Sequence, residues 1–357
     1  MNRVFSIGVL VMSVLFLGAG CTFKFGSGDG SVFKSTDRGQ KWESKSLMLL
    51  PKGRQVRLTN VDVTKILIDP RDSNRIFMGT KAHGLFASEN GAESWLQLIP
   101  GEFINDIAID PLAKCVLYAI GQARILKTTD CAQHWEVIYN ETRTNVFVTS
   151  MLIDPFSSNV LYAVTTGGDI FKSIDTGSSW LVQSRLPGEK IEKILADKWD
   201  QNLLYLATRD GKIYRSSNRG IRWDDISGPL KVYPESNSYT HMDVLTTKDG
   251  LFFASQHALF KTKDGGKSWE KINVLVPGGS VQIFSAAVNP VNTSELYYAT
   301  QKTLYRTSDN GYQWVAQPHP SARVPSALSI DPNNSSIVYL GAKTVAETAK
   351  YWYNPSQ

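Results

Sequence analysis

The stretch Ser173-Ile-Asp175-Thr-Gly177-Ser-Ser-Trp180 recurs, with variation, seven times along this chain of 357 residues. Each copy has the form Ser/Thr-x-Asp/Asn-x-Gly/Ala-x-x-Trp, and we call each copy a box. Successive boxes lie 40 to 53 residues apart and end at Trp42, Trp95, Trp135, Trp180, Trp223, Trp269 and Trp314. A period of this length is typical of propellers and solenoids.

The residue types of the box indicate a tight turn. The side chain of Asp or Asn can accept hydrogen bonds from backbone N–H groups two residues further on, and Gly tolerates a positive φ. The tryptophan adds a large apolar plug to each repeat. We therefore expect the third residue of each box to form a turn and to have no catalytic role; these residues are Asp37, Asn90, Asp130, Asp175, Asn218, Asp264 and Asp309.

Between the boxes the chain alternates short apolar runs with turn residues. One repeat reads Ile66-Leu-Ile-Asp69-Pro70, then Arg75-Ile-Phe-Met-Gly79-Thr80, then Gly84-Leu-Phe-Ala-Ser88 before its box. Runs of β-branched and aromatic residues bounded by Asp-Pro, Gly and Asn are strands joined by turns. Four strands per repeat make one propeller blade.

The two ends of the repeat region complement each other. Val32-Phe33-Lys34 and the first box supply only the outer two strands of a blade, whereas residues 328–332 and 337–340 supply only inner ones. Joining them completes a seventh blade and hides free strand edges. The sequence thus predicts an all-β fold, a seven-bladed β-propeller over residues 31–343, closed by N-terminal strands, with a C-terminal tail at 344–357.

The N-terminal segment has the features of an export signal. Arg3 precedes an apolar run from Val4 to Gly20, and this run ends in Leu17-Gly-Ala-Gly-Cys21, which resembles the bacterial lipobox. We expect residues 1–20 to be a lipoprotein signal peptide, Cys21 to be lipidated, and residues 21–30 to form a tether; a transmembrane helix is the alternative. The mature protein would then be anchored to a membrane and face the periplasm, a lumen or the cell surface.

The repeat resembles a known family of propellers. The boxes resemble the Asp-box, or bacterial neuraminidase, repeat, and seven of them in a lipoprotein resemble the exported photosystem II assembly and stability factor family. The Asp-Pro segments, such as Asp69-Pro70, and the Val-Leu-Tyr segments that begin at Val116 and Val160 are similar to those of sortilin and xyloglucanase-type propellers. In all these families the box is structural, and the resemblance to the assembly factors implies a protein-binding role.

Charge and cysteine content restrict the partners. Removing residues 1–20 takes one basic residue from 38 and none of the 33 acidic residues, which leaves a net charge of +4. This mild charge does not indicate a nucleic-acid-binding protein. Cys115 and Cys131 fall in one blade, and in an oxidising compartment they are either a structural disulfide or two separate thiols.

A search for catalytic chemistry finds no convincing site. A glycosidase needs two carboxyl groups about 5–10 Å apart, and Glu102, Asp106, Glu141 and Asp169 show no spacing that pairs them, so we expect them to be solvated side chains on loops. The five histidines show neither helical i, i+4 spacing nor adjacent cysteine pairs, which argues against a zinc site. We therefore predict a protein without a catalytic residue, metal or cofactor.

Long loops between blades are the expected place for recognition, because loops on a rigid scaffold carry function. These loops cover residues 49–61, 139–149, 184–191, 228–241 and 317–326. We predict a basic, aromatic-dotted face that docks an acidic segment of an envelope or membrane protein, formed by Arg54, Arg57, Arg143, Arg209, Tyr233, Tyr239 and Arg323. The alternative is a glycan-binding or glycoside-hydrolase propeller that uses the same face.

Overall fold

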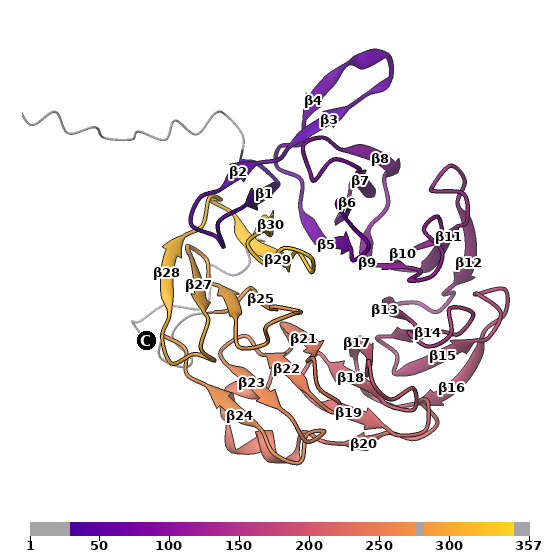
Figure 1. Cartoon of the computed structure of the whole chain (residues 1–357). Helices are drawn as coiled ribbons and strands as arrows, with labels where there is room; N and C mark the ends of the chain where they lie inside the picture. Colours follow the sequence, from indigo (N-terminus) through magenta and orange to yellow (C-terminus); the bar gives the residue numbers. More distant parts are fainter. Residues whose placement is uncertain (1–28, 276–281, 346–357) are drawn as a thin grey trace, which may run out of the picture.

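A computed structural model describes residues 29–275 and 282–345. Seven four-stranded antiparallel sheets stand around a central axis like blades, as Figure 1 shows. The predicted seven-bladed propeller is therefore confirmed. The predicted signal peptide (1–20), Cys21, most of the tether and nearly all of the C-terminal tail lie outside the described residues. Among the residues that are described, no helix is long and apolar enough to cross a membrane.

Each blade runs from an innermost to an outermost strand. Blade 1 contains β5 (Val63–Asp69), β6 (Asp72–Thr80), β7 (Leu85–Ser88) and β8 (Leu96–Ile99); blade 2 contains β9 (Ile104–Ile109), β10 (Leu117–Gly121), β11 (Arg124–Thr128) and β12 (Glu136–Asn140). Blade 3 contains β13 (Val148–Ile153), β14 (Leu161–Thr165), β15 (Asp169–Ser173) and β16 (Leu181–Arg185); blade 4 contains β17 (Ile191–Ala196), β18 (Leu204–Thr208), β19 (Ile213–Ser216) and β20 (Asp224–Asp225).

The remaining blades follow the same order. Blade 5 contains β21 (His241–Val244), β22 (Leu251–Ala254), β23 (Leu259–Thr262) and β24 (Glu270–Ile272); blade 6 contains β25 (Ser285–Val288), β26 (Leu296–Ala299), β27 (Thr303–Thr307) and β28 (Val315–Pro318). Blade 7 contains β29 (Val324–Ile330), β30 (Val338–Lys343), β1 (Val32–Ser35) and β2 (Glu43–Ser44). A hairpin, β3 (Leu47–Leu49) and β4 (Gln55–Arg57), surrounds the short 3-10 turn Pro51–Gly53, and two more 3-10 turns, Gly228–Val232 and Pro234–Ser236, precede blade 5.

Blade 7 joins the two ends of the described chain. Strand β1 pairs antiparallel with β30, with Val32 opposite Gly341 and Ser35 opposite Val338. The predicted closure by N-terminal strands is therefore present, and it completes the seventh four-stranded sheet.

The boxes fold into one recurring turn. In the fourth box the hydroxyl of Ser173 donates to Asp175 at 2.7 Å and accepts from the Gly177 N–H at 2.8 Å, and the Asp175 carboxylate accepts from the Ser179 N–H at 2.9 Å. The N–H of the fifth residue reaches the first hydroxyl in the other six boxes as well. Gly177 has a φ of +94°, as the turn chemistry requires.

Five of the seven box tryptophans donate their indole N–H to the preceding blade or to the segment that leaves it, whereas Trp42 donates within its own box and Trp135 has no partner among the described residues. The indole N–H of Trp180 donates to the carbonyl oxygen of Ile138 at 3.0 Å, and that of Trp314 donates to Asn273 at 2.7 Å. A tyrosine of the second strand contacts the following blade instead. In blade 3, for example, the hydroxyl of Tyr162 lies 3.4 Å from the carbonyl oxygen of Arg219 in the next box. The repeat therefore encodes the joints between blades as well as the blades themselves.

Cys115 and Cys131 form a disulfide, with their Cα atoms 4.1 Å apart. Cys115 precedes β10 and Cys131 lies in the box after β11, so the bond ties two turns of blade 2 together. Both turns lie on the face that carries the boxes.

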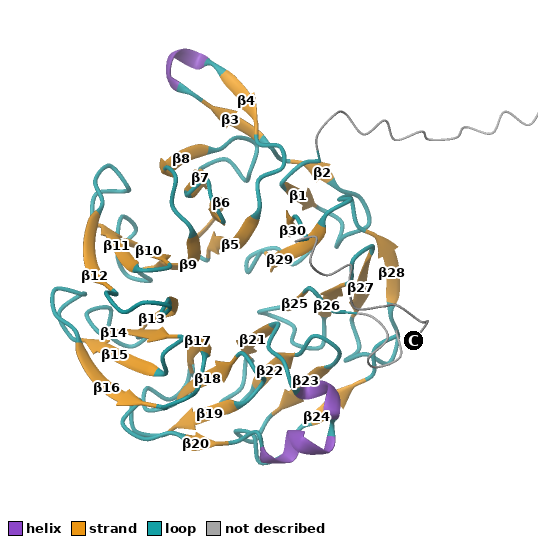
Figure 2. Cartoon of the chain, turned by 180° about the vertical axis from the view of Figure 1, so that it is seen from behind, coloured by secondary structure: helices purple, strands orange, loops and turns teal. Residues whose placement is uncertain are grey.

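Antiparallel pairing places the connections on two faces. The boxes and the turns between first and second strands lie on one face, which we call the box face. The turns between second and third strands and the loops between blades lie on the other, which we call the channel face because the innermost strands begin there. Figure 2 shows the ring from behind relative to Figure 1.

Candidate functional site

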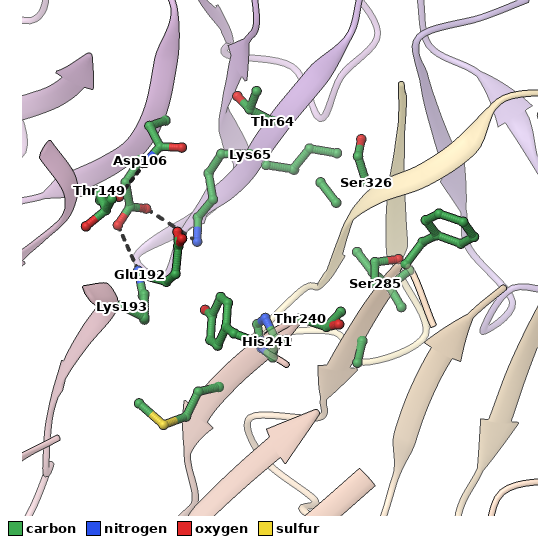
Figure 3. Close-up of a pocket in the computed structure, with 18 residues that line it drawn as sticks. Thr64, Lys65, Asp106, Thr149, Glu192, Lys193, Thr240, His241, Ser285 and Ser326 are labelled. Carbon is green, nitrogen blue, oxygen red and sulfur yellow. Dashed lines mark hydrogen bonds and ion pairs between the residues drawn. The ribbon is translucent and has the colours of Figure 1, made fainter. Parts of the chain in front are cut away.

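The innermost strands enclose a pocket on the propeller axis, with a volume of about 200 Å³. The first residues of these strands line it, so the pocket opens toward the channel face. Its side chains are mostly polar, and Figure 3 shows them converging from different blades: Thr64, Lys65, Asp106, Thr149, Glu192, Lys193, Thr240, His241, Ser285 and Ser326.

The carboxylate of Asp106 forms two ion pairs and a hydrogen bond in this pocket. Its buried carboxylate lies 2.8 Å from the ammonium group of Lys193 and 3.5 Å from that of Lys65, and it accepts a hydrogen bond from Ser150 at 2.8 Å. Burial alone would raise the pKa of Asp106, but the two ammonium groups and the hydroxyl outweigh burial and hold the pKa well below its ordinary value. The carboxylate is therefore ionised and cannot serve as a general acid.

His241 lies in the same pocket and stays neutral at physiological pH. Burial lowers its pKa to about 4, and Lys65 and Lys193 act in the same direction against the opposing charge of Asp243. Burial also raises the pKa of the neighbouring Tyr239. The pocket thus contains one cluster of paired charges, Asp106 with Lys65 and Lys193, beside neutral aromatic and hydroxyl groups.

The hydroxyl of Ser285 is buried at the pocket wall and has no hydrogen-bond partner among the described residues. A buried polar atom without a partner costs free energy, so a polar ligand in the pocket would gain by pairing with it.

The four carboxylates considered for a glycosidase all form ion pairs. Asp106 pairs with lysines, Glu102 with Arg124, and Glu141 and Asp169 both pair with Arg143. The expectation that they are solvated loop residues is wrong for three of them, because Asp106, Glu141 and Asp169 are buried and strands β9 and β15 carry Asp106 and Asp169. Arg143 lowers the pKa of Glu141 to about 2, so this carboxyl is ionised as well.

Three arginines of the predicted basic face are neutralised by neighbouring acids. Arg143 contacts Glu141 at 2.6 Å and Asp169 at 2.7 Å, Arg209 contacts Glu192 at 2.5 Å, and Arg323 contacts Asp62 at 2.5 Å. Arg323 is also nearly buried, with 10% of its side chain exposed. Each of these arginines therefore shares its charge with a carboxylate, while the side chains of Arg143 and Arg209 stay about half exposed.

The other predicted partner residues lie apart from one another. Tyr239 lines the pocket, whereas Tyr233 packs on Phe260 with ring centroids 5.4 Å apart. Arg54 and Arg57 are exposed on the β3–β4 hairpin, which projects from the rim of the ring (Figure 1). The predicted residues do not form one patch.

On the channel face, many carboxylates are ion-paired whereas several exposed lysines are not. Nine carboxylates on this face each take part in an ion pair: Asp62, Glu102, Asp106, Glu141, Asp169, Glu189, Glu192, Asp210 and Glu235. In the part of the chain that the structure describes, five exposed lysines of this face have no such partner: Lys81, Lys190, Lys231, Lys302 and Lys343.

Sequence reasoning missed Lys65, Lys193 and Ser285, although a positional signal exists. Each lies four residues before the Asp or Asn that begins the first turn of its blade, as Asp106 does before Asp110. A polar residue at this position of an otherwise apolar innermost strand faces the axis, because strand side chains alternate between faces.

Comparisons with known proteins find similar folds but no matching sequence family. No family profile and no curated sequence matches the chain. Among solved structures, the GH74 xyloglucanase of Xanthomonas campestris matches with a TM-score of 0.65 and 17% identity over 79% of this chain and 51% of that chain. The GH74 enzyme of Niastella koreensis gives 0.66 and 14% over 79% and 51%.

A smaller protein matches along nearly all of its length. YCF48 bound to a D1 peptide has a TM-score of 0.61 and 14% identity over 80% of this chain and 95% of that chain. This chain spans only about half the length of the two GH74 enzymes. At such identities the similarity shows the propeller fold alone.

Proposed function

We propose that this propeller is a non-catalytic docking protein whose channel face binds an acidic segment of a membrane or envelope protein, as an assembly or stability factor does. The observation that carries this proposal is the charge of that face, where nine carboxylates are already ion-paired and five exposed lysines are not. Free cations around a rigid rim attract an acidic partner and orient it.

The comparisons support peptide binding by this fold. YCF48 was solved with a D1 peptide bound and matches this chain over four fifths of its length. We further propose that Cys21 is acylated, as the N-terminal sequence indicates, so that the propeller acts at a membrane outside the cytoplasm.

Glycan binding or hydrolysis is the second candidate, because two GH74 enzymes share the fold and the axial pocket offers hydroxyl groups and the unpartnered Ser285. Hydrolysis requires one carboxyl with a raised pKa. The pKa of Asp106 is instead lowered, and Glu192, the other pocket carboxylate, pairs with Arg209. The docking proposal is therefore the better supported.

A pull-down from detergent-solubilised native membranes tests the proposal. The mature protein is compared with a channel-face variant (Lys81→Glu, Lys190→Glu, Lys302→Glu) and with a box-face control (Lys41→Glu, Lys263→Glu, Lys267→Glu) that changes the net charge equally. We expect one membrane protein to be retained by the wild type and the control and lost by the channel-face variant. Equal retention by all three, or retention of polysaccharide alone, contradicts docking through this face.

A further inference from the structure

The β3–β4 hairpin stands outside the seven blades and projects from the rim, as both Figure 1 and Figure 2 show. Its base is fixed to blade 1, because the Trp95 N–H donates to Leu47 at 2.8 Å and the Leu49 N–H donates to Trp95 at 2.9 Å. Residues 51–57 beyond this base are all exposed. A two-stranded hairpin alone is only marginally stable in water. A hairpin that projects in this way is therefore a candidate for binding another surface.

The composition of the hairpin is unusual for a solvated segment. Residues 47–57 contain three basic side chains and no acidic one, together with three leucines, a methionine, a valine and a proline. Lys52, Arg54 and Arg57 form no ion pair with any described residue. Apolar side chains occupy both faces, because Met48 pairs with Val56 on one and Leu47 and Leu49 share the other.

The hairpin lies where the chain enters the propeller. The Asn60 N–H donates to the Asp29 carbonyl at 3.2 Å, and Gly30 bridges to Thr59. The Asp29 carboxylate is held by the hydroxyl of Ser321 at 2.5 Å and the N–H of Ala322 at 3.0 Å. Cys21 precedes Asp29 by eight residues, which span at most about 28 Å when extended. An anchor at Cys21 thus keeps the hairpin close to the bilayer.

We propose that the hairpin Leu47–Arg57 binds the surface of an anionic lipid bilayer. Leu49, Leu50 and Pro51 would enter the interface between headgroups and acyl chains, and the three basic side chains would contact lipid phosphates. The orientation toward the membrane rests on the proposed anchor, whereas the affinity of the hairpin for lipid does not. Each basic residue near an anionic surface strengthens binding roughly fivefold, so the three together contribute about 100-fold.

The mixture of apolar and basic groups favours lipid over protein as the occupant. A bilayer surface offers many phosphates with an apolar layer directly beneath them. Long basic side chains can reach these phosphates while their aliphatic stems contact the apolar layer, so binding requires no matching of shapes. A hairpin beside the tether also gives the anchored protein a second contact with the membrane.

Vesicle sedimentation tests the proposal on the mature chain with Cys21→Ser, which cannot be acylated. We expect binding to vesicles of phosphatidylcholine with one third phosphatidylglycerol, little binding to phosphatidylcholine alone, and weakening by salt. The hairpin variant (Lys52→Gln, Arg54→Gln, Arg57→Gln) should bind about 100-fold more weakly. The control variant (Lys81→Gln, Lys190→Gln, Lys302→Gln) loses the same charge on the channel face and should bind as the wild type does.

A second measurement locates the contact. Gly53→Cys in the Cys21→Ser background places a thiol at the hairpin tip, because Cys115 and Cys131 are joined and do not react. An environment-sensitive dye at this position should shift to shorter emission wavelength on anionic vesicles. No shift, equal binding by the hairpin variant, or equal weakening by the control variant overturns the proposal. Loss of the protein partner by the hairpin variant, without vesicle binding by the wild type, assigns the hairpin to a protein instead.

Discussion

The ammonium group of Lys34 in blade 7 donates a hydrogen bond to the carbonyl oxygen of Gly91 in blade 1, 2.9 Å away. The hydroxyl of Tyr339 reaches the same oxygen at 3.4 Å. In blade 2 the ammonium group of Lys127 donates to the side-chain hydroxyl of Thr176 at 2.9 Å, and the hydroxyl of Tyr118 lies 3.5 Å from the Thr176 carbonyl oxygen. The joint between blades 7 and 1 and the joint between blades 2 and 3 therefore each use a lysine and a tyrosine that contact the fourth residue of the next box.

We predict that Lys34→Met with Tyr339→Phe lowers the free energy of unfolding by about 2 kcal/mol, because each hydrogen bond contributes about 1 kcal/mol. The matched pair Lys127→Met with Tyr118→Phe should lower it by a similar amount, since it also removes two hydrogen bonds to one residue of the next box. Urea unfolding of the two variants measures both values. If the free energy of unfolding falls for the Lys127 and Tyr118 variant but not for the Lys34 and Tyr339 variant, other contacts hold blade 7 against blade 1.

Gly177→Ala should be more destabilising than an ordinary glycine substitution in a turn. Gly177 has a φ of +94°, and an added Cβ would lie 2.5 Å from Cδ1 of Ile138 in the preceding blade. Gly188→Ala is the control, because its φ is +83° but no atom lies within 4 Å of the added Cβ. The left-handed conformation costs an L-residue about 1–2 kcal/mol, so the control should lose that amount and Gly177→Ala more.

Unfolding of both glycine variants, and of Gly177→Ala combined with Ile138→Ala, separates the two causes. If the extra loss comes from the clash across the joint, the double substitution should lose less than the two single losses combined. Additive losses would place the effect in the backbone of the box alone.

The repeat explains why the fold was predictable while the site was only partly so. Asp175, Gly177 and Trp180 act within a few residues or against the adjacent blade, so a local motif and its period are sufficient to predict turns, blades and closure. Ion pairs are different. Arg323 and Asp62 are 261 residues apart in sequence and meet only because the ring closes, so their neutralisation could not be predicted from composition.

Strand register explains the remaining difference. Lys65, Asp106 and Lys193 occupy equivalent positions in different blades, and alternation of side chains turns all three toward the axis. An alignment of the repeats on the Asp or Asn of the first turn places these three residues in one column, and it would have predicted that they meet at the axis. The β3–β4 hairpin has no counterpart among the other described blades, so no alignment of repeats could have predicted its projection.

His241 should make stability depend on pH in the weakly acidic range. Its pKa is about 4 in the folded protein against an ordinary value of 6.5. Between these values the unfolded chain binds more protons than the folded one, so the free energy of unfolding falls as the pH drops from 6.5 to 4. We expect His241 to account for about 2 kcal/mol of that fall, allowing for its partial exposure.

Urea unfolding at several pH values from 7.5 to 4, with His241→Gln beside the wild type, measures this contribution. The variant should show a shallower dependence on pH. His319, whose pKa burial also lowers, remains in both proteins and contributes to the residual slope, as do carboxyls with lowered pKa values such as Glu141. An unchanged slope in the variant would mean that His241 is not held in its neutral form by the pocket.

Asp106→Asn tests the charge cluster on the axis. The substitution removes the carboxylate that lies between Lys193 and Lys65, at 2.8 and 3.5 Å, and leaves both largely buried ammonium groups without the carboxylate that pairs with them. Breaking one partner of such a pair costs about 3 kcal/mol. Adding Lys193→Met should recover part of this loss, because it removes one uncompensated charge while keeping most of the side-chain volume. If Asp106→Asn instead unfolds at the same urea concentration as the wild type, water must already screen the cluster, and the pocket is open to solvent.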